Sequence, residues 1–427
     1  MSAGLSRASA ARPPALAGEI ALRRLANGLE LATIVNRQAP IVSSAIFFKV
    51  GARDEPPGRG GLAHFLEHLM FKGSERFGPG EIDRRTQALG GTNNAFTSHD
   101  VTAFWFSFAA DRWTEALDIE ADRMRGLRLD PAEVDAERRV IVEEIAMYRD
   151  DPWDALELDV EAALHSGHPY ALPVLGSERE LAEESPEVLR DFHRRWYVPG
   201  NAVLVVAGDL GPEVVETVEA TMGGLEGAAP LRPALVASTT PAGEVRIERR
   251  HGEVPRLLIA LPAPPPDHPE HGPLRLAATL LAGGRASRLQ RRLVDEGELC
   301  LSVTAAVSDE QLGASFSVAA ELLPGSAPAD VEAIVREELA ALAAVPPGEA
   351  EMERARQVFL ADWAYEQERI HQQAVVAGLA LALFDPGQPA RLLDSALACA
   401  PAELAAIAAR RLEPAAGSVV GVSRPES

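Results

Sequence analysis

Two histidines and a glutamate lie within one five-residue segment, His64-Phe65-Leu66-Glu67-His68. Residues four apart share one face of an α-helix, so the imidazoles of His64 and His68 can bind a single Zn²⁺ ion. Glu67 lies one residue before the second histidine, beside the position that a metal-bound water would take. The spacing is the reverse of the HExxH zinc motif. It predicts a zinc site in which Glu67 takes a proton from that water.

A five-residue motif also fits a partly exposed helix whose histidines form ordinary hydrogen bonds. The neighbouring residues favour the zinc site, because Gly60 and Gly61 precede the motif and four apolar side chains can bury the helix around it: Leu62, Phe65, Leu66 and Leu69. A catalytic zinc site needs a third protein ligand and an open position for water. We expect that third ligand on another element.

The segment 131–151 is predicted to form a long helix that begins at Pro131, and it carries glutamates that could supply the third ligand. Glu137 and Glu144 are seven residues apart and lie on nearly one face, whereas Glu143 points about 100° away from Glu144. One carboxylate can bind zinc while another orients a ligand or the water. The alternative is that these glutamates form a solvated acidic face. The spacing alone does not decide between a zinc ligand and such a face.

The elements that must position these residues follow from the hydrophobic pattern. Residues 92–100 and 101–110 are predicted to form a strand pair. A stretch rich in Ala, Pro, Thr and Gly at 229–243 is interpreted as a linker. The order of strand, helix, strand pair and helix recurs on both sides of it, without a second HxxEH motif. We therefore expect a disordered leader at 1–18 and two similar α/β domains, at 19–228 and 244–427.

The composition of the 427-residue chain limits its partners. The formal charge of −22 disfavours nucleic acids and anionic membrane surfaces, and it favours cationic partners such as basic peptides. No apolar run reaches the roughly 18–20 residues that cross a membrane. The N-terminal residues contain no continuous hydrophobic region, so we expect no secretory signal and a cytoplasmic protein.

The chain resembles the pitrilysin/insulinase family, which includes the mitochondrial processing peptidases and carries the HxxEH motif of the inverzincins. The resemblance extends from about residue 19 to the C-terminus. The segments that carry it are GLAHFLEHLMFKGSERF, GGTNNAFTSHDVTAFWF, ERRVIVEEI, HPYALPVLGS, FHRRWYVPGNAVLVVAGDL and GRASRLQRRLVDEG.

This resemblance implies a role for each candidate residue. It implies one zinc ion per chain, bound by His64, His68 and Glu144. Glu67 matches the general base of the family, and Glu137 matches the acid that supports catalysis. The implied activity is endopeptidase cleavage of peptides or unfolded segments.

The same resemblance implies an α+β fold and a way to bind substrate. The expected fold has two homologous α/β domains of the processing-peptidase type, each a mostly antiparallel sheet packed with helices, which form half of a clamshell chamber. Asn94 and Ala95 match an edge strand that pairs with the substrate backbone. An extended peptide can join such a strand because its outer N–H and C=O groups are free.

One feature of the family is missing from this chain. Members carry an Arg and a Tyr, seven residues apart, that hold the substrate and stabilise the oxyanion. Aligned on Leu299, these positions fall on Val294 and Leu301, which cannot donate a hydrogen bond. The resemblance then implies a heterodimer with a zinc-free homologous subunit that supplies both groups. A function of another class, a non-catalytic binding or assembly subunit, is disfavoured by the intact HxxEH motif and Glu144.

Overall fold

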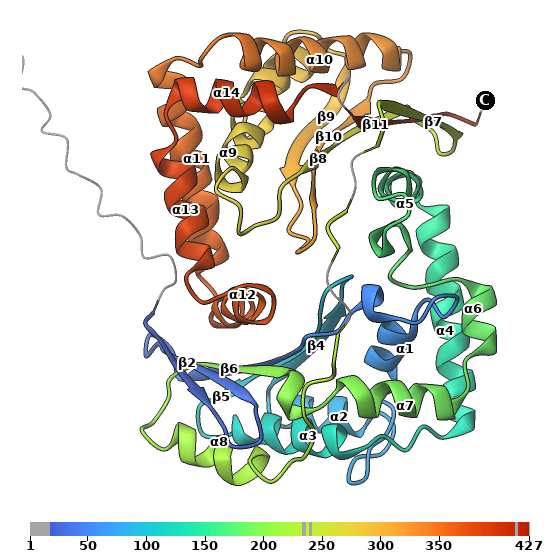
Figure 1. Cartoon of the computed structure of the whole chain (residues 1–427), viewed down its shortest axis with the longest axis vertical. Helices are drawn as coiled ribbons and strands as arrows, with labels where there is room; N and C mark the ends of the chain where they lie inside the picture. The colour runs from blue at the N-terminus through green and yellow to red at the C-terminus, as the bar shows by residue number, and fades with distance from the viewer. Residues whose placement is uncertain (1–17, 233–235, 239–240, 415–416, 427) are drawn as a thin grey trace, which may run out of the picture.

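The computed structural model describes residues 18–232, 236–238, 241–414 and 417–426. The leader expected at 1–18 lies outside the described residues except for Gly18, and part of the linker expected at 229–243 lies outside them too. Each half of the chain is built on one β-sheet with helices packed against it (Figure 1).

The first sheet has six strands in the order β1-β2-β6-β3-β5-β4. Neighbouring strands are antiparallel except for β2 and β6, which are parallel. Strand β4 lies at one edge, where β5 is its strand partner. The strands are β1 (Ile20–Arg24), β2 (Glu30–Val35), β3 (Ile41–Phe48), β4 (Thr92–Thr97), β5 (Thr102–Ala109) and β6 (Ala202–Gly208).

Helices of the first half cover one face of this sheet (Figure 1). The alternation of a β-strand separates the two faces, because Phe104, Phe106 and Phe108 of β5 enter the core beneath these helices while Ala103 enters the core on the other face. The helices of this half are α1 (Leu62–Leu69), α2 (Glu81–Ala88), α3 (Thr114–Arg125), α4 (Pro131–Asp150), α5 (Pro152–Leu164), α6 (Glu178–Glu183), α7 (Pro186–Trp196) and α8 (Val214–Met222).

The second sheet has five strands in the order β7-β11-β8-β10-β9, with β7 and β11 parallel and the other pairs antiparallel. Its strands are β7 (Glu244–Arg250), β8 (Arg256–Ala263), β9 (Cys300–Val307), β10 (Ala314–Leu322) and β11 (Ser418–Arg424). Its helices are α9 (His271–Ala282), α10 (Pro328–Ala344), α11 (Glu349–Glu366), α12 (Ile370–Leu383), α13 (Gln388–Ala398) and α14 (Pro401–Arg411), and a π-helical turn spans Gln290–Asp295.

The prediction of two α/β domains with mostly antiparallel sheets is confirmed by these two sheets and their helices. Among the described helices, none is by itself long and apolar enough to cross a membrane. Helices α13 and α14 reach that length and composition only as a pair bent by 110°, and both contribute side chains to the second core.

The two halves exchange one helix each. Helix α12 of the second half packs on β3 and β6 of the first sheet, and α5 of the first half packs on β8 and β11 of the second sheet. Glycines permit both approaches: a Cβ atom at Gly378 would lie 2.0 Å from Phe47, and one at Gly421 would lie 2.6 Å from Val160. The relative position of the halves is therefore set by core packing on both sheets.

Candidate metal centre

Helix α1 holds His64 in a buried position and His68 in a partly buried one. The residue that caps its N-terminus is Gly61, whose positive φ of 91° is the left-handed conformation that glycine adopts without strain. The carboxylate of Glu55 accepts hydrogen bonds from the backbone N–H groups of Gly61 and Ala63, at 2.9 and 2.8 Å. It thereby satisfies two of the amide donors that the first turn of a helix leaves without partners.

His64, His68 and Glu144 converge on one point. The Nε2 atoms of His64 and His68 lie 3.7 and 3.6 Å from Oε2 of Glu144. Tetrahedral zinc with bonds of about 2.0–2.1 Å places its ligand atoms about 3.4 Å apart, so these side chains fit one zinc ion with little movement. They form the one group of at least three potential metal ligands that the described part of the chain contains.

The protonation of His64 also suits a metal ligand. Its side chain is buried, and burial, followed by the neighbouring His68, lowers the pKa of His64 to about 4. The imidazole is therefore neutral at neutral pH and has a lone pair available for a metal. Its Nδ1 atom is buried and finds no hydrogen-bond partner among the described residues, whereas its Nε2 atom faces Glu144.

Glu137 lies behind His68 and does not join the ligand group. Its Oε2 atom is 3.1 Å from Nδ1 of His68, and its Oε1 atom is 2.6 Å from Nζ of Lys72. Burial raises the pKa of Glu137, but the bonds from His68 and Lys72 outweigh it and the net shift is downward. An ionised Glu137 that accepts from Nδ1 leaves Nε2 of His68 free to bind a metal. Glu143 is exposed and points away from the site.

Glu67 lies beside the ligand group on the same helix and lines the same cavity. Its Oε2 atom accepts a hydrogen bond of 2.7 Å from the hydroxyl of Thr97, the last residue of β4. Burial raises the pKa of Glu67, and the bonds and charges of Thr97 and His68 oppose that shift only in part. A carboxylate with a raised pKa is a better proton acceptor, which suits a general base. The sequence analysis did not single out Thr97.

Strand β4 brings Asn94 and Ala95 to the open edge of the first sheet. These residues pair with Trp105 and Phe104 of β5 on the inner side. The amide of Ala95 donates to the side-chain oxygen of its neighbour Asn94, at 2.9 Å, instead of to another strand. A peptide that adds to this edge can replace that side-chain contact with a backbone hydrogen bond.

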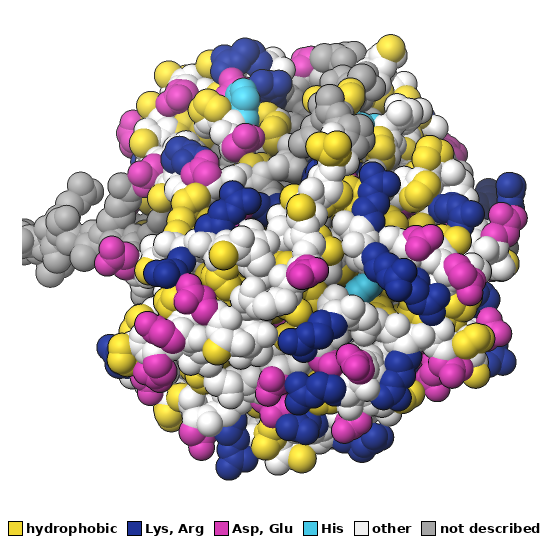
Figure 2. Space-filling view, turned by 60° about the horizontal axis from the view of Figure 1, so that its bottom comes forward, with side chains coloured by type: hydrophobic (Ala, Val, Ile, Leu, Met, Phe, Trp, Pro, Cys, Tyr) yellow, Lys and Arg dark blue, Asp and Glu magenta, His cyan; other side chains and the backbone are white. Residues whose placement is uncertain are grey.

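The metal centre opens into an acidic cavity of about 550 Å³. Besides the ligands and Glu67, the cavity is lined by Asp154, Glu157 and Glu161 of α5. Burial, and then the charges of the neighbouring acids, raise the pKa of Glu157. The outer face shown in Figure 2 differs, because acidic and basic side chains are interspersed on it. The cavity is therefore one place where the negative charge of the chain is concentrated.

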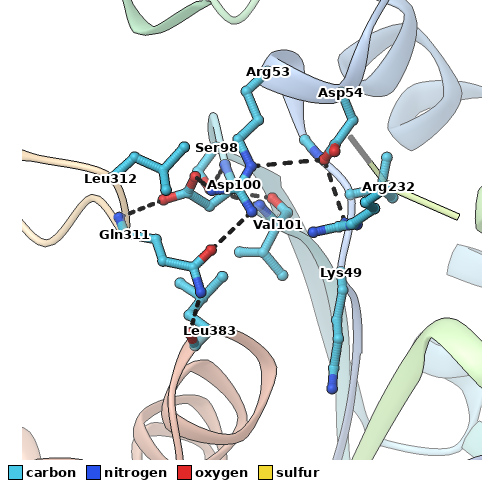
Figure 3. Close-up of polar contacts among 12 residues, drawn as sticks. Lys49, Arg53, Asp54, Ser98, Asp100, Val101, Arg232, Gln311, Leu312 and Leu383 are labelled. Atoms are coloured by element: carbon cyan, nitrogen blue, oxygen red, sulfur yellow. Dashed lines mark hydrogen bonds and ion pairs between the residues drawn. The ribbon is translucent and has the colours of Figure 1, made fainter. Parts of the chain in front are cut away.

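A buried polar cluster joins the two halves next to this cavity (Figure 3). Asp100, three residues after Thr97, accepts hydrogen bonds from Arg53 at 2.5 Å and from the hydroxyl of Tyr170 at 2.6 Å. It also accepts from the backbone N–H of Gln311 in the β9–β10 loop, at 2.8 Å. Arg53 in turn donates to the side-chain oxygen of Gln311 at 2.8 Å. The sequence analysis predicted none of these contacts.

Comparisons with known proteins show which family and fold the chain resembles. A family model described as Insulinase (Peptidase family M16) matches residues 30–178, and one described as Peptidase M16 inactive domain matches residues 184–359. An uncharacterized zinc protease of Mycobacterium leprae is 33% identical over 332 residues, which cover 76% of this chain and 74% of that protein. One of Streptomyces coelicolor is 31% identical over 316 residues, with 72% and 69% covered.

A solved structure shares the whole fold. The crystal structure of a protease from Helicobacter pylori matches with a TM-score of 0.89 and covers 96% of this chain and 100% of that chain. The sequence identity is 22%, so this likeness bears on the fold alone.

Proposed function

The chain belongs to the insulinase family, peptidase family M16, and we propose that it is a zinc-dependent endopeptidase that cleaves peptides or unfolded segments. Its relatives carry the name zinc protease. The observation that supports the proposal most directly is the convergence of the His64 and His68 Nε2 atoms on Glu144, with Glu67 beside them. The family model described as inactive matches residues 184–359, and the candidate ligands all lie before that range.

Each residue of the site has a task in peptide hydrolysis. Zinc, when bound, supplies a Lewis acid that polarises the scissile carbonyl and lowers the pKa of a bound water. Glu67 accepts the proton of the attacking water and delivers it to the leaving amine. Thr97 holds the carboxylate of Glu67 in place, and Glu137 fixes the orientation of the His68 ring.

The cavity suggests which peptides bind. The edge of β4 at Asn94 and Ala95 offers backbone groups to an extended peptide, which favours unfolded segments over folded proteins. Asp154, Glu157 and Glu161 give the cavity a negative potential. Basic side chains near the scissile bond should therefore strengthen binding.

The oxyanion donors are the part of the site for which we propose a partner. Val294 lies in the π-helical turn and packs against the second core, and Leu301 is 52% exposed on β9. Neither side chain can donate a hydrogen bond. We propose that a zinc-free homologous subunit supplies an Arg and a Tyr to this chain's cavity in a heterodimer.

A simple experiment tests the peptidase proposal. Purified protein is analysed for zinc and assayed on an unstructured basic peptide, alone and with a candidate partner subunit. Zinc near one ion per chain together with cleavage that a chelator abolishes supports the proposal. A chain that holds no zinc at neutral pH would contradict it, because the three ligands form a complete protein set for a catalytic zinc site.

A further inference from the structure

A second cavity, of about 410 Å³, lies at the seam between the two halves. One wall is the turn between β4 and β5, and the opposite wall is formed by α12, α13 and neighbouring parts of the second half. The polar cluster of Asp100 and Gln311 lies at this seam, since Asp100 lines the cavity and Gln311 donates to the backbone oxygen of Leu383 at its wall (Figure 3). The contact between the halves thus determines the width of the cavity.

This second cavity adjoins the metal cavity. Three residues, Phe96, His99 and Val174, line both. Phe96 belongs to β4, so a peptide that extends along β4 beyond Ala95 runs toward the second cavity. At a rise of about 3.3 Å per residue, the four positions from Ala95 to His99 correspond to about 13 Å of extended peptide.

The wall formed by α12 is apolar. Val376, Leu379 and Leu383 recur at helical spacing and remain only partly buried. Leu379 and Leu383 also pack against the apolar cluster between this helix and the first sheet. Phe96 of β4 lines the same cavity. An apolar side chain of suitable size can remove this surface from water, which stabilises the complex by roughly 25 cal/mol per Å² of apolar area buried.

The polar groups around this wall are suited to bind a peptide. Trp363 is only 5% exposed and its indole N–H has no hydrogen-bond partner among the described residues. A buried donor of this kind is usually paired, and a peptide carbonyl is a suitable acceptor. Asp309, Glu310 and Glu366 line the cavity together with one cation, Arg275. Among the described residues Glu366 forms no direct ion pair, although Arg275 lies near enough for its charge to act on the carboxylate, so a basic side chain of the ligand can pair with Glu366.

We propose that the second cavity is a distal subsite for the same peptide that the metal centre cleaves. It takes an apolar side chain about four residues away from the position that pairs with Ala95, and Glu366 pairs with an adjacent Lys or Arg. The indole of Trp363 donates to the peptide backbone. This inference rests on the proposed peptidase function, and it adds a specificity determinant that lies outside the metal cavity.

The test uses the zinc-loaded Glu67→Gln variant of the full chain, which should bind a peptide without cleaving it. Binding of unstructured peptides is measured by tryptophan fluorescence and by calorimetry. The peptides carry a Leu-Arg pair moved step by step away from a fixed central segment, and an Ala-Ala pair serves as the reference. We expect one spacing to bind at least 10-fold more tightly than the reference.

Three substitutions then locate the binding site. Glu366→Lys and Leu379→Gln should each remove the 10-fold gain, and Trp363→Phe should weaken binding and abolish the fluorescence change. Glu353→Lys is the matched control, because it makes the same charge change on the exposed side of the same helix. The Glu353→Lys variant should keep the 10-fold tighter binding of the Leu-Arg peptide.

The experiment separates failure of the proposed subsite from failure of the proposed peptidase function. If the zinc-loaded Glu67→Gln variant binds peptides but Glu366→Lys and Leu379→Gln leave every affinity unchanged, the subsite is wrong and the peptidase proposal stands. If zinc-loaded protein binds no peptide of either type, both the subsite and the proposed function are overturned.

Discussion

The carboxylate of Asp100 accepts a hydrogen bond of 2.8 Å from the backbone N–H of Gln311, a residue 211 positions later in the chain. Asp100 belongs to the turn that ends β4, and Gln311 belongs to the loop between β9 and β10. The same carboxylate pairs with Arg53 and is only 3% exposed. One buried acid therefore connects the second half to the strand that carries Thr97, the hydrogen-bond partner of Glu67.

Asp100→Asn should destabilise the protein by about 3 kcal/mol, because it removes the carboxylate that lies 2.5 Å from the buried guanidinium of Arg53 and leaves that group only Asp54, at 3.9 Å. Gln311→Ala should cost less, since the backbone N–H that binds Asp100 remains. Denaturant unfolding measures both, and the double variant should show a non-additive loss because the two residues share one network. Equal losses of stability in the two single variants, or additive losses in the double variant, would contradict the assignment of Asp100 as the main link in a network that it shares with Gln311.

Glu144→Gln should weaken zinc binding far more than Glu143→Gln. Glu144 faces both histidine Nε2 atoms, whereas Glu143 is exposed. Glu137→Gln should have an intermediate effect of about 10- to 100-fold on zinc affinity, because it only orients the ring of His68. Competition with a chromogenic chelator measures the three affinities, and a larger effect at Glu143 than at Glu144 would overturn the assignment of the third ligand.

The pH dependence of stability should contain a contribution from His193. Burial lowers the pKa of His193 to about 4, while its Nε2 atom lies 3.0 Å from the backbone oxygen of Arg123. The unfolded chain binds a proton near pH 6.5 and the folded chain does not, so stability is full above about pH 6.5 and falls as the pH drops toward 4. Over that pH range, protonation of this histidine in the unfolded chain should lower the free energy of unfolding by about 3 kcal/mol.

Unfolding of the wild type and of His193→Gln at several pH values isolates that contribution. The free energies of the two proteins should converge as the pH falls from 7 to 4, because the variant has no histidine to protonate at this position. A constant difference across that range would show that His193 is not the group that titrates.

The chain alone should cleave peptides slowly, and a zinc-free relative that carries the Arg and Tyr should raise the rate by about 10²-fold or more, since loss of an oxyanion donor costs two to three orders of magnitude. Rates measured for each subunit and for the mixture test this. The control is Tyr148→Phe, because Tyr148 lines the metal cavity of this chain. Full activity of the isolated chain, lost in Tyr148→Phe, would assign the donor to this chain and contradict the partner proposal.

The two histidines could be proposed as metal ligands because their spacing obeys the period of a helix, whereas the family resemblance selected Glu144. His64 and His68 are one turn apart on α1, and Glu144 lies on α4, a long helix that begins at Pro131 as predicted. The edge position of β4 likewise followed from a strand pair with recognisable alternation and from the family resemblance. In each case local spacing or a recognisable motif carried the information.

The contacts and the helix that the sequence did not predict depend on how distant segments of the chain pack together. Thr97 contacts Glu67 only because β4 passes beside α1, and Asp100 meets Gln311 only because the second half docks on the first. Helix α12 was not predicted as an element, because it is apolar on the side that packs on the first sheet and on the side that lines the second cavity. A helix buried on several sides lacks the single stripe that periodicity detects.

The central claim is that Glu67 is the base of a zinc site to which it contributes no ligand atom. The most direct test is to measure zinc content and peptide cleavage of Glu67→Gln together, with Glu143→Gln as the control. The account predicts that Glu67→Gln keeps about one zinc per chain and loses activity by at least about 10²-fold, while the control keeps both. Loss of the metal in Glu67→Gln, or cleavage at the wild-type rate, would contradict the account.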